Sequence, residues 1–149
     1  MAQVQDINIK LFSFGHSFGV PVDVDLLFSI RHLPVTNVEN YQQYDGRHQR
    51  IQNELLHLTE YESFIKTIIE QLKNFTNEHN KNSITIAIGC EQGRHRSVAL
   101  VERLGDLLGN TYNMNVSHRD LERTGYERRK QRERTKNRDR KYNNYADSI

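Results

Sequence analysis

The sequence predicts a single compact α/β domain with a central, mostly parallel sheet flanked by helices, followed by a basic C-terminal tail. Short apolar, β-branched runs occur between longer segments of helical periodicity, and the run at 83–89 leads through a Gly-containing loop into a helix. A length of 149 residues suits one domain, but the mean hydropathy of -0.81 indicates that part of the chain lies outside the core. We therefore expect a folded domain over residues 1–125 and a tail over residues 126–149.

Two strands are predicted in the first third of the chain. Residues 7–14 alternate well enough for a half-buried strand, and the loop 15–19, with Gly at both ends, breaks it. Ligands of open α/β sheets bind at the carboxyl ends of strands, so His16 is either a ligand contact or a solvated loop histidine. The second strand covers residues 26–31, and Arg31 at its end is a candidate anion contact.

Two helices are predicted in the middle of the chain. Ile51, Leu55 and Leu58 are spaced for one helical face. Residues 59–62 have the pattern of a capping box, with Thr59 as the N-cap, and introduce the clearest amphipathic helix in the chain. Its apolar positions, which we assign to the core, are Tyr61, Phe64, Ile65, Ile68, Ile69, Leu72 and Phe75. A polar loop over residues 74–82 then precedes the strand at 83–89.

The loop at 90–97 is the strongest candidate for chemistry. Unpaired N–H groups at the start of the following helix attract anions, and Gly93, His95, Arg96 and Ser97 allow or provide further contacts. The spacing C-x-x-G-x-x-R-S also resembles the phosphate loop of cysteine-dependent phosphatases, with Cys90 as nucleophile and Arg96 as phosphate ligand. We favour anion binding without catalysis because no residue stands out as the general acid. A plain strand-to-helix turn is the remaining alternative.

The last predicted elements are a helix and a strand. The helix presents Val98, Val101 and Leu104 on one face and ends at Gly109. The strand over residues 112–117 delivers His118 and Arg119 at its end. In a parallel sheet a right-handed crossover brings this strand near the central one, so we expect both side chains to border the Cys90 loop.

The tail carries most of the positive charge. Residues 128–141 contain nine Lys or Arg and two acidic residues, a local charge of +7 that leaves -5 for the rest of the chain. This asymmetry predicts contacts to a nucleic-acid backbone without sequence preference. Candidate contacts are Arg119, Arg128, Arg129, Lys130 and Arg132.

Other sequence features indicate a cytoplasmic protein. The single Cys excludes an intramolecular disulfide, and the sequence offers neither a signal peptide nor an apolar run of the ~20 residues needed to span a bilayer. We expect no metal, no cofactor and no membrane partner.

Several motifs, in order, resemble one known family. Residues 89–98 read G-C-x-x-G-x-H-R-S-V, which is similar to the signature of the RapZ C-terminal domain, from the RNase adaptor family. Residues 13–25, 31–34 and 117–122 resemble the opening, the continuation and the end of that domain. The resemblance covers about residues 8–123.

The resemblance implies a fold similar to part of 6-phosphofructokinase, without catalysis. It also implies sensing of glucosamine 6-phosphate, a phosphorylated amino sugar, together with RNA binding, RNA presentation to a nuclease and self-association as a homo-oligomer. It places His16, Arg31, Gly93, His95 and Arg96 near the sugar-phosphate pocket, and it implies that Arg128, Arg129 and Lys130 contact RNA.

This sequence departs from the family pattern in two respects. Glu91 and Gln92 replace the Thr-Gly that follows the family's Cys, so a carboxylate stands where a phosphate-facing hydroxyl is expected. The motif G-x-x-x-x-G-K-[ST] does not occur, and we expect a free-standing relative without the family's nucleotide-binding domain. The ligand of this chain can therefore differ from that of the family.

Overall fold

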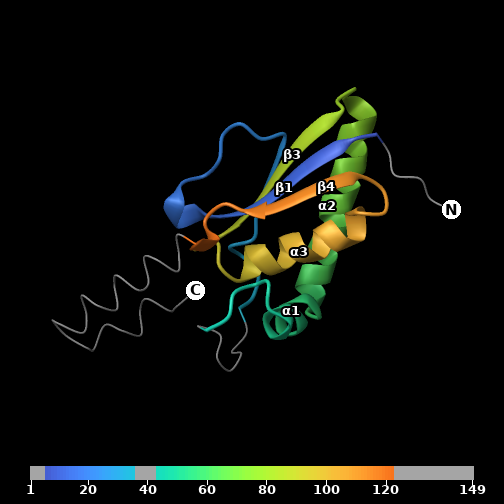
Figure 1. Cartoon of the computed structure of the whole chain (residues 1–149). Helices are drawn as coiled ribbons and strands as arrows, with labels where there is room; N and C mark the ends of the chain where they lie inside the picture. The colour runs from blue at the N-terminus through green and yellow to red at the C-terminus, as the bar shows by residue number, and fades with distance from the viewer. Residues whose placement is uncertain (1–5, 36–42, 123–149) are drawn as a thin grey trace.

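A computed structural model describes residues 6–35 and 43–122 of the chain. These residues form a four-stranded sheet in the order β2-β3-β1-β4, and every pair of neighbouring strands is parallel (Figure 1). The strands are β1 (Asn8–Gly15), β2 (Leu26–Ser29), β3 (Ser83–Cys90) and β4 (Asn113–His118). The predicted α/β class with a parallel sheet is confirmed.

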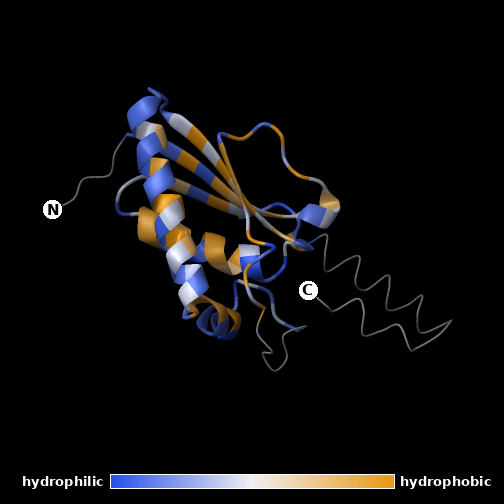
Figure 2. Ribbon diagram, turned by 180° about the vertical axis from the view of Figure 1, so that it is seen from behind, coloured by the Kyte–Doolittle hydropathy of each residue, from blue (hydrophilic) through white to orange (hydrophobic). Residues whose placement is uncertain are grey.

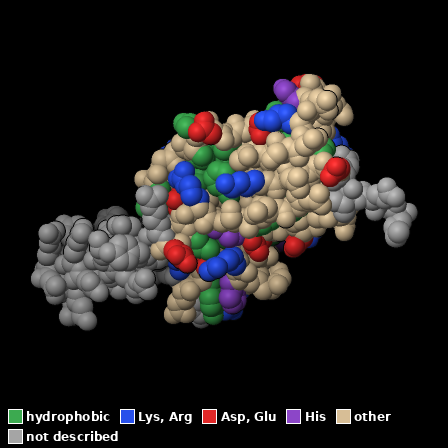
Figure 3. All heavy atoms as spheres, turned by 45° about the horizontal axis from the view of Figure 1, so that its top comes forward, with side chains coloured by type: hydrophobic (Ala, Val, Ile, Leu, Met, Phe, Trp, Pro, Cys, Tyr) green, Lys and Arg blue, Asp and Glu red, His purple; other side chains and the backbone are tan. Residues whose placement is uncertain are grey.

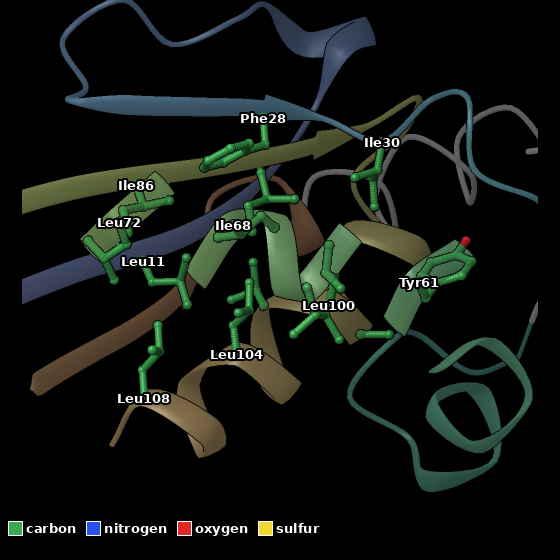
Figure 4. Packing of buried hydrophobic residues seen from close by; sticks show 14 of the residues in the cluster. Leu11, Phe28, Ile30, Tyr61, Ile68, Leu72, Ile86, Leu100, Leu104 and Leu108 are labelled. Atoms are coloured by element: carbon green, nitrogen blue, oxygen red, sulfur yellow. The ribbon is translucent and has the colours of Figure 1, made fainter. Parts of the chain in front are cut away.

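Helices occupy one face of this sheet. They are α1 (Gln49–Leu56), α2 (Thr59–Glu78) and α3 (Arg96–Leu108), and a 3-10 turn, η1 (His16–Phe18), follows β1. The register places Ile9 beside Ile84 and Leu11 beside Ile86, so β1 and β3 direct their aliphatic side chains to the same layer. Figure 4 shows Leu11 facing Leu104 and Leu108 of α3 and Ile86 beside Leu72 of α2, all within one buried cluster. The main core lies between the sheet and the helices.

The opposite face has a smaller apolar cluster. Phe12, Phe14 and Ala87 form it, and Val24 from the segment between β1 and β2 packs against it. Figure 2 shows the sheet and α2 from behind, with hydrophobic and hydrophilic residues alternating along both. Within the described residues, helices therefore cover one face of the sheet, and the segment between β1 and β2 packs on the other.

The predicted capping box at the start of α2 is wrong. Thr59 is the first helical residue, Leu58 is the N-cap, and no side chain caps the helix. Instead, the main-chain carbonyl of Leu58 accepts from the N–H groups of Tyr61 and Glu62. Tyr61 is fully buried and donates its hydroxyl to the Pro34 carbonyl at 2.7 Å, so tertiary packing decides where this helix begins. The helix also extends to Glu78, further than the predicted loop over residues 74–82 allows.

Candidate functional site

The carboxyl ends of three strands meet at one edge of the sheet. Gly15 at the end of β1 lies beside Cys90 at the end of β3, and Ser29 at the end of β2 lies beside Gly89. The segments that follow these strands, including η1 and residues 30–35 and 91–95, consequently converge. This edge is where open parallel sheets bind ligands.

Gly89 in β3 leaves room for an aromatic ring, and His16 packs on that ring and reaches the end of β2. A Cβ atom on Gly89 would lie 2.2 Å from the Phe14 ring, so only glycine leaves room for that ring to lie over β3. His16 packs on the same ring at a centroid distance of 5.0 Å, and its Nε2 lies 2.9 Å from the Ser29 hydroxyl of β2. The predicted candidate His16 thus joins β1 to β2 across the central strand.

Arg31 forms an ion pair at this edge with a residue of the Cys90 loop. Its Nε lies 2.8 Å from Glu91 Oε2, and the two side chains are 55% and 44% exposed. The main-chain carbonyl of Glu91 accepts from the Ser17 N–H at 3.0 Å, which ties the loop to η1. Arg31 is accessible to solvent, but a carboxylate already lies against it.

The charges of Arg31 and Glu91 both affect the pKa of His16. Partial burial lowers the pKa of His16, the Arg31 guanidinium lowers it further, and the Glu91 carboxylate acts in the opposite direction. The imidazole therefore lies within the electrostatic field of both charged groups. An anion that bound beside Arg31 would favour its protonated form.

The Cys90 loop is held close to β1. Gly93 has a φ of 74°, and a Cβ there would lie 2.6 Å from the Gly15 nitrogen, so the backbones of the two loops touch. The Gly93 N–H donates to Cys90 Sγ at 3.3 Å, and Ser97 Oγ lies 3.2 Å from the same sulfur. Cys90 is fully buried, so its thiol is not presented to solvent as an attacking nucleophile would have to be.

His95 and Arg96 are turned into the domain. Nε2 of His95 donates to the Tyr44 carbonyl at 2.7 Å. Arg96 is 3% exposed, and its Nη1 donates to the carbonyls of Arg31 and Leu33 at 3.2 and 3.1 Å. Its buried Nε has no hydrogen-bond partner among the described residues. Arg96 therefore holds the segment after β2 in place.

The β4 end lies one strand further out than the sequence suggests, because β1 separates β4 from β3. Nδ1 of His118 lies 2.8 Å from Ser13 Oγ, and its Nε2 lies 2.8 Å from Glu102 Oε2. Arg119 pairs with the fully buried Asp120, which also accepts from the Gly15 N–H at 2.8 Å. His118 and Arg119 are thus bonded within the domain.

Only part of the predicted site comes together as an open cluster. His16 and Arg31 meet there, and sequence reasoning missed their partners Ser29 and Glu91 as site residues. Apart from its position near the end of a predicted strand, no sequence feature indicated Ser29 as a site residue. Glu91 was already distinguished by its departure from the family pattern. Arg128, Arg129, Lys130 and Arg132 lie outside the described residues.

Elsewhere on the surface, charges of opposite sign are mixed. Figure 3 shows basic side chains interspersed with acidic ones on one face. A shallow hollow of about 300 Å³ is lined by Gln43, Tyr44, Asp45, Arg47 and His48. There, Arg47 pairs with Asp45 through two bonds of 3.1 and 2.9 Å.

Within residues 6–35 and 43–122, His, Cys, Asp and Glu side chains form no group of three or more that could hold a metal ion. Nor does any helix in these ranges have the length and apolarity needed to cross a membrane.

Comparison with known proteins identifies the family. The RapZ C-terminal domain family matches residues 7–122. A "Nucleotide-binding protein" from Halalkalibacterium halodurans is 37% identical over 121 residues, covering 78% of this chain and 41% of the relative. Proteins of the same name from Lactiplantibacillus plantarum and Listeria monocytogenes are 32% and 33% identical over 125 and 120 residues, covering 81% and 78% of this chain. The chain spans about two fifths of the length of these relatives, at 42% and 41% for the latter two. The chain belongs to the RapZ C-terminal domain family.

Proposed function

We propose that this domain is a non-enzymatic adaptor that senses a phosphorylated amino sugar or a similar small anion and binds RNA. The observation that carries the sensing part is the exposed Arg31 beside His16, where three parallel strands end. The family resemblance and the sequence of the basic tail carry the RNA part.

The cluster has the chemistry that an anion sensor needs. Arg31 can donate to phosphate oxygens, and Ser29 and His16 add a hydroxyl and an imidazole within hydrogen-bond distance of each other. The bonds that hold the surrounding loops, from Ser17 to Glu91 and from Arg96 to two carbonyls, keep this edge in a defined shape. Binding can thus proceed with little ordering of the backbone, which favours affinity.

The RNA-binding part is assigned to the tail. Nine cations in residues 128–141 supply a charge density that the mixed surface in Figure 3 does not match. Arg119 is bonded to Asp120, so we expect the tail residues to dominate over it. A nuclease partner and self-association follow from the resemblance alone.

One experiment tests sensing against catalysis. Thermal shift with a panel of sugar phosphates, including glucosamine 6-phosphate, is measured in the same wells as phosphate release. The proposal predicts stabilisation without release. Release of phosphate that is lost in Cys90→Ser would instead support a cysteine-dependent phosphatase, although the buried thiol argues against that outcome.

A second experiment tests RNA binding by the tail. Filter binding of single-stranded RNA is measured over a range of salt concentrations for the full chain and for a truncation that lacks residues 126–149. Phosphate neutralisation predicts a linear fall of log affinity with log salt, about -0.7 per contact, and a flatter slope after truncation. An unchanged slope in the truncated protein would contradict the assignment to the tail.

A further inference from the structure

We propose that the hollow beside Tyr44 and His48 is a second ligand site, which takes an unpaired purine base. The site shares no residue with the Arg31 cluster. It adds recognition of a base to the backbone contacts proposed for the tail. It does not depend on those contacts, because the base of a free nucleotide would satisfy the same residues.

The first step is a pair of stacked rings in the lining of the hollow. The centroids of the Tyr44 and His48 rings lie 3.8 Å apart, and the two planes are 18° from parallel. Tyr44 packs against the main core, whereas His48 is exposed. The face of the imidazole that points away from Tyr44 can therefore take a third ring, and aromatic side chains bind unpaired bases by such stacking.

The second step is that the backbone holds this ring pair in place before a ligand binds. The Tyr44 carbonyl accepts from His95 Nε2 at 2.7 Å, and the Gly46 N–H donates to the Arg94 carbonyl at 2.8 Å. A Cβ on Gly46 would lie 2.3 Å from the His95 carbonyl oxygen, so the turn lies directly against the start of α3. His48 Nδ1 accepts a main-chain N–H of the first turn of α1 at 3.1 Å. A base can thus stack with little ordering of the protein, which favours affinity.

The third step is the polar rim of the hollow. Arg47 donates to both oxygens of Asp45, from Nε at 3.1 Å and from Nη2 at 2.9 Å. Its planar guanidinium is therefore held in one orientation although the side chain is 60% exposed. Gln43 also lines the hollow. Arginine and glutamine form paired hydrogen bonds with the exposed edges of guanine and adenine, so the rim favours a purine over a pyrimidine.

The charges around Arg47 favour a base over a phosphate group. Hydrogen bonds to Asp45 raise the pKa of Arg47, partial burial opposes this effect, and the carboxylates of Asp45, Glu102 and Glu122 raise the pKa further. Three carboxylates thus act on one guanidinium, which makes it a poor partner for a phosphate. The volume of about 300 Å³ is at the small end of ligand pockets and suits a single ring system.

A purely structural role for the ring pair predicts something different. Phe75 and His79 at the end of α2 stack in the same way, at 4.1 Å and 19°, but neither lines the hollow. If the pair of Tyr44 and His48 only stabilised α1, replacing either histidine would leave the binding of a base unchanged. A ligand site predicts that only the replacement of His48 weakens it.

The test follows the fluorescence of 2-aminopurine, a purine analogue that is quenched when it stacks. Full-length wild type, His48→Asn and His79→Asn are titrated with 2-aminopurine riboside and with single-stranded RNA that carries one 2-aminopurine. High salt weakens the phosphate contacts of the tail. His48→Asn removes the ring but keeps a residue that caps helices well, and His79→Asn is the matched control. Thermal melts check that each variant is folded, and competition by AMP and CMP tests the preference for purines.

We expect the wild type to quench 2-aminopurine and to bind AMP about tenfold more tightly than CMP. His48→Asn should weaken binding of the probe by about tenfold, as for the loss of one stacked ring, and His79→Asn should stay within about twofold of the wild type. Quenching of the riboside would support a free nucleotide as the source of the base, and quenching of the strand alone would support RNA.

Three results would overturn the site. These are no quenching of either probe, equal effects of the two histidine variants, and equal competition by AMP and CMP. Each would leave RNA binding by the tail intact, because the salt titration of the truncated protein tests that part separately.

Discussion

The two halves of the sheet edge each have an arginine paired with a carboxylate, but the two carboxylates differ in solvent exposure. At the ends of β2 and β3, Arg31 and Glu91 form an exposed pair beside His16. At the end of β4, Arg119 and Asp120 form a pair whose carboxylate is fully buried. A cation at a strand end is available to a ligand only where buried acceptors of the fold do not already bind it.

Strand order explains the difference. β4 lies beside β1, and α3 covers the junction, so His118 meets Ser13 and Glu102 before any ligand can reach it. In the described part of the region after β2, Ile30 and Leu33 are buried but the Arg31 side chain is 55% exposed. We therefore propose the first half of the edge as the ligand-binding half, whereas the side chains of the second half hold the loops together.

The largest expected effect is at Asp120. Replacing Asp120 with Ala removes the acceptor of the Gly15 N–H and leaves Arg119 without its carboxylate. A broken buried pair of this kind lowers the free energy of unfolding by about 3 kcal/mol. Urea denaturation measures the loss, and Arg31→Gln, in the exposed pair, should lose less than about 1 kcal/mol. Equal losses of unfolding free energy in Asp120→Ala and Arg31→Gln would contradict the difference between the two halves of the sheet edge.

A smaller loss is expected where the Cys90 loop touches β1. Gly93→Ala places a Cβ 2.6 Å from the Gly15 nitrogen in a backbone with a φ of 74°, at a cost of about 2 kcal/mol or more. Gly19 has a φ of 96° with nothing within 4 Å of its Cβ position, so Gly19→Ala isolates the backbone cost of about 1 kcal/mol. Thermal denaturation of both variants separates close contact from strain. A loss in Gly93→Ala no greater than in Gly19→Ala would argue against tight packing of the two loops.

A further effect of about 1 kcal/mol is expected at Ser13. Ser13→Ala removes the hydroxyl that contacts His118 Nδ1 in the interior. Because this contact belongs to the structural half of the edge, sugar-phosphate affinity measured by calorimetry should stay within about twofold of the wild type. A large loss of affinity in a folded Ser13→Ala protein would place the ligand near β4 instead.

The smallest expected effect is a pH dependence at His16. Its pKa is lowered in the fold, mainly by partial burial, so the unfolded chain takes up the proton more readily. The stability contributed by neutral His16 is complete above pH 6.5 and is lost as the pH falls through its lowered pKa. Chemical denaturation at pH 7.5 and 5.5 should therefore reveal a smaller loss in His16→Gln than in the wild type. An identical loss in both proteins would mean that other groups account for the acid sensitivity.

Sequence patterns identified the fold more completely than the site. Alternation in β1 and β3 and the apolar spacing in α2 and α3 report which face is buried, and the structure confirms the parallel α/β fold that they predict. The capping box failed because the packing of Tyr61 outweighed a local side-chain cap.

Site residues were harder to predict because the type of a residue does not reveal whether its side chain points to solvent or into the interior. Arg96 follows Cys90 at the spacing of a phosphate ligand, yet its guanidinium donates to two main-chain carbonyls in the interior. Glu91 became part of the site only once the register had brought the end of β3 beside the segment after β2. Such contacts depend on strand order, which local periodicity does not encode.

The most direct test of the central claim compares two exposed arginines. Arg31 and Arg47 each pair with a carboxylate, at 2.8 and 2.9 Å, but only Arg31 lies at the ends of β2 and β3. Calorimetric titration with glucosamine 6-phosphate is performed on the wild type, Arg31→Gln and Arg47→Gln. We predict that Arg31→Gln raises the dissociation constant at least about tenfold, as expected for a lost charged hydrogen bond, while Arg47→Gln changes it by less than about twofold. Unaltered affinity in Arg31→Gln, or a loss confined to Arg47→Gln, would contradict the account.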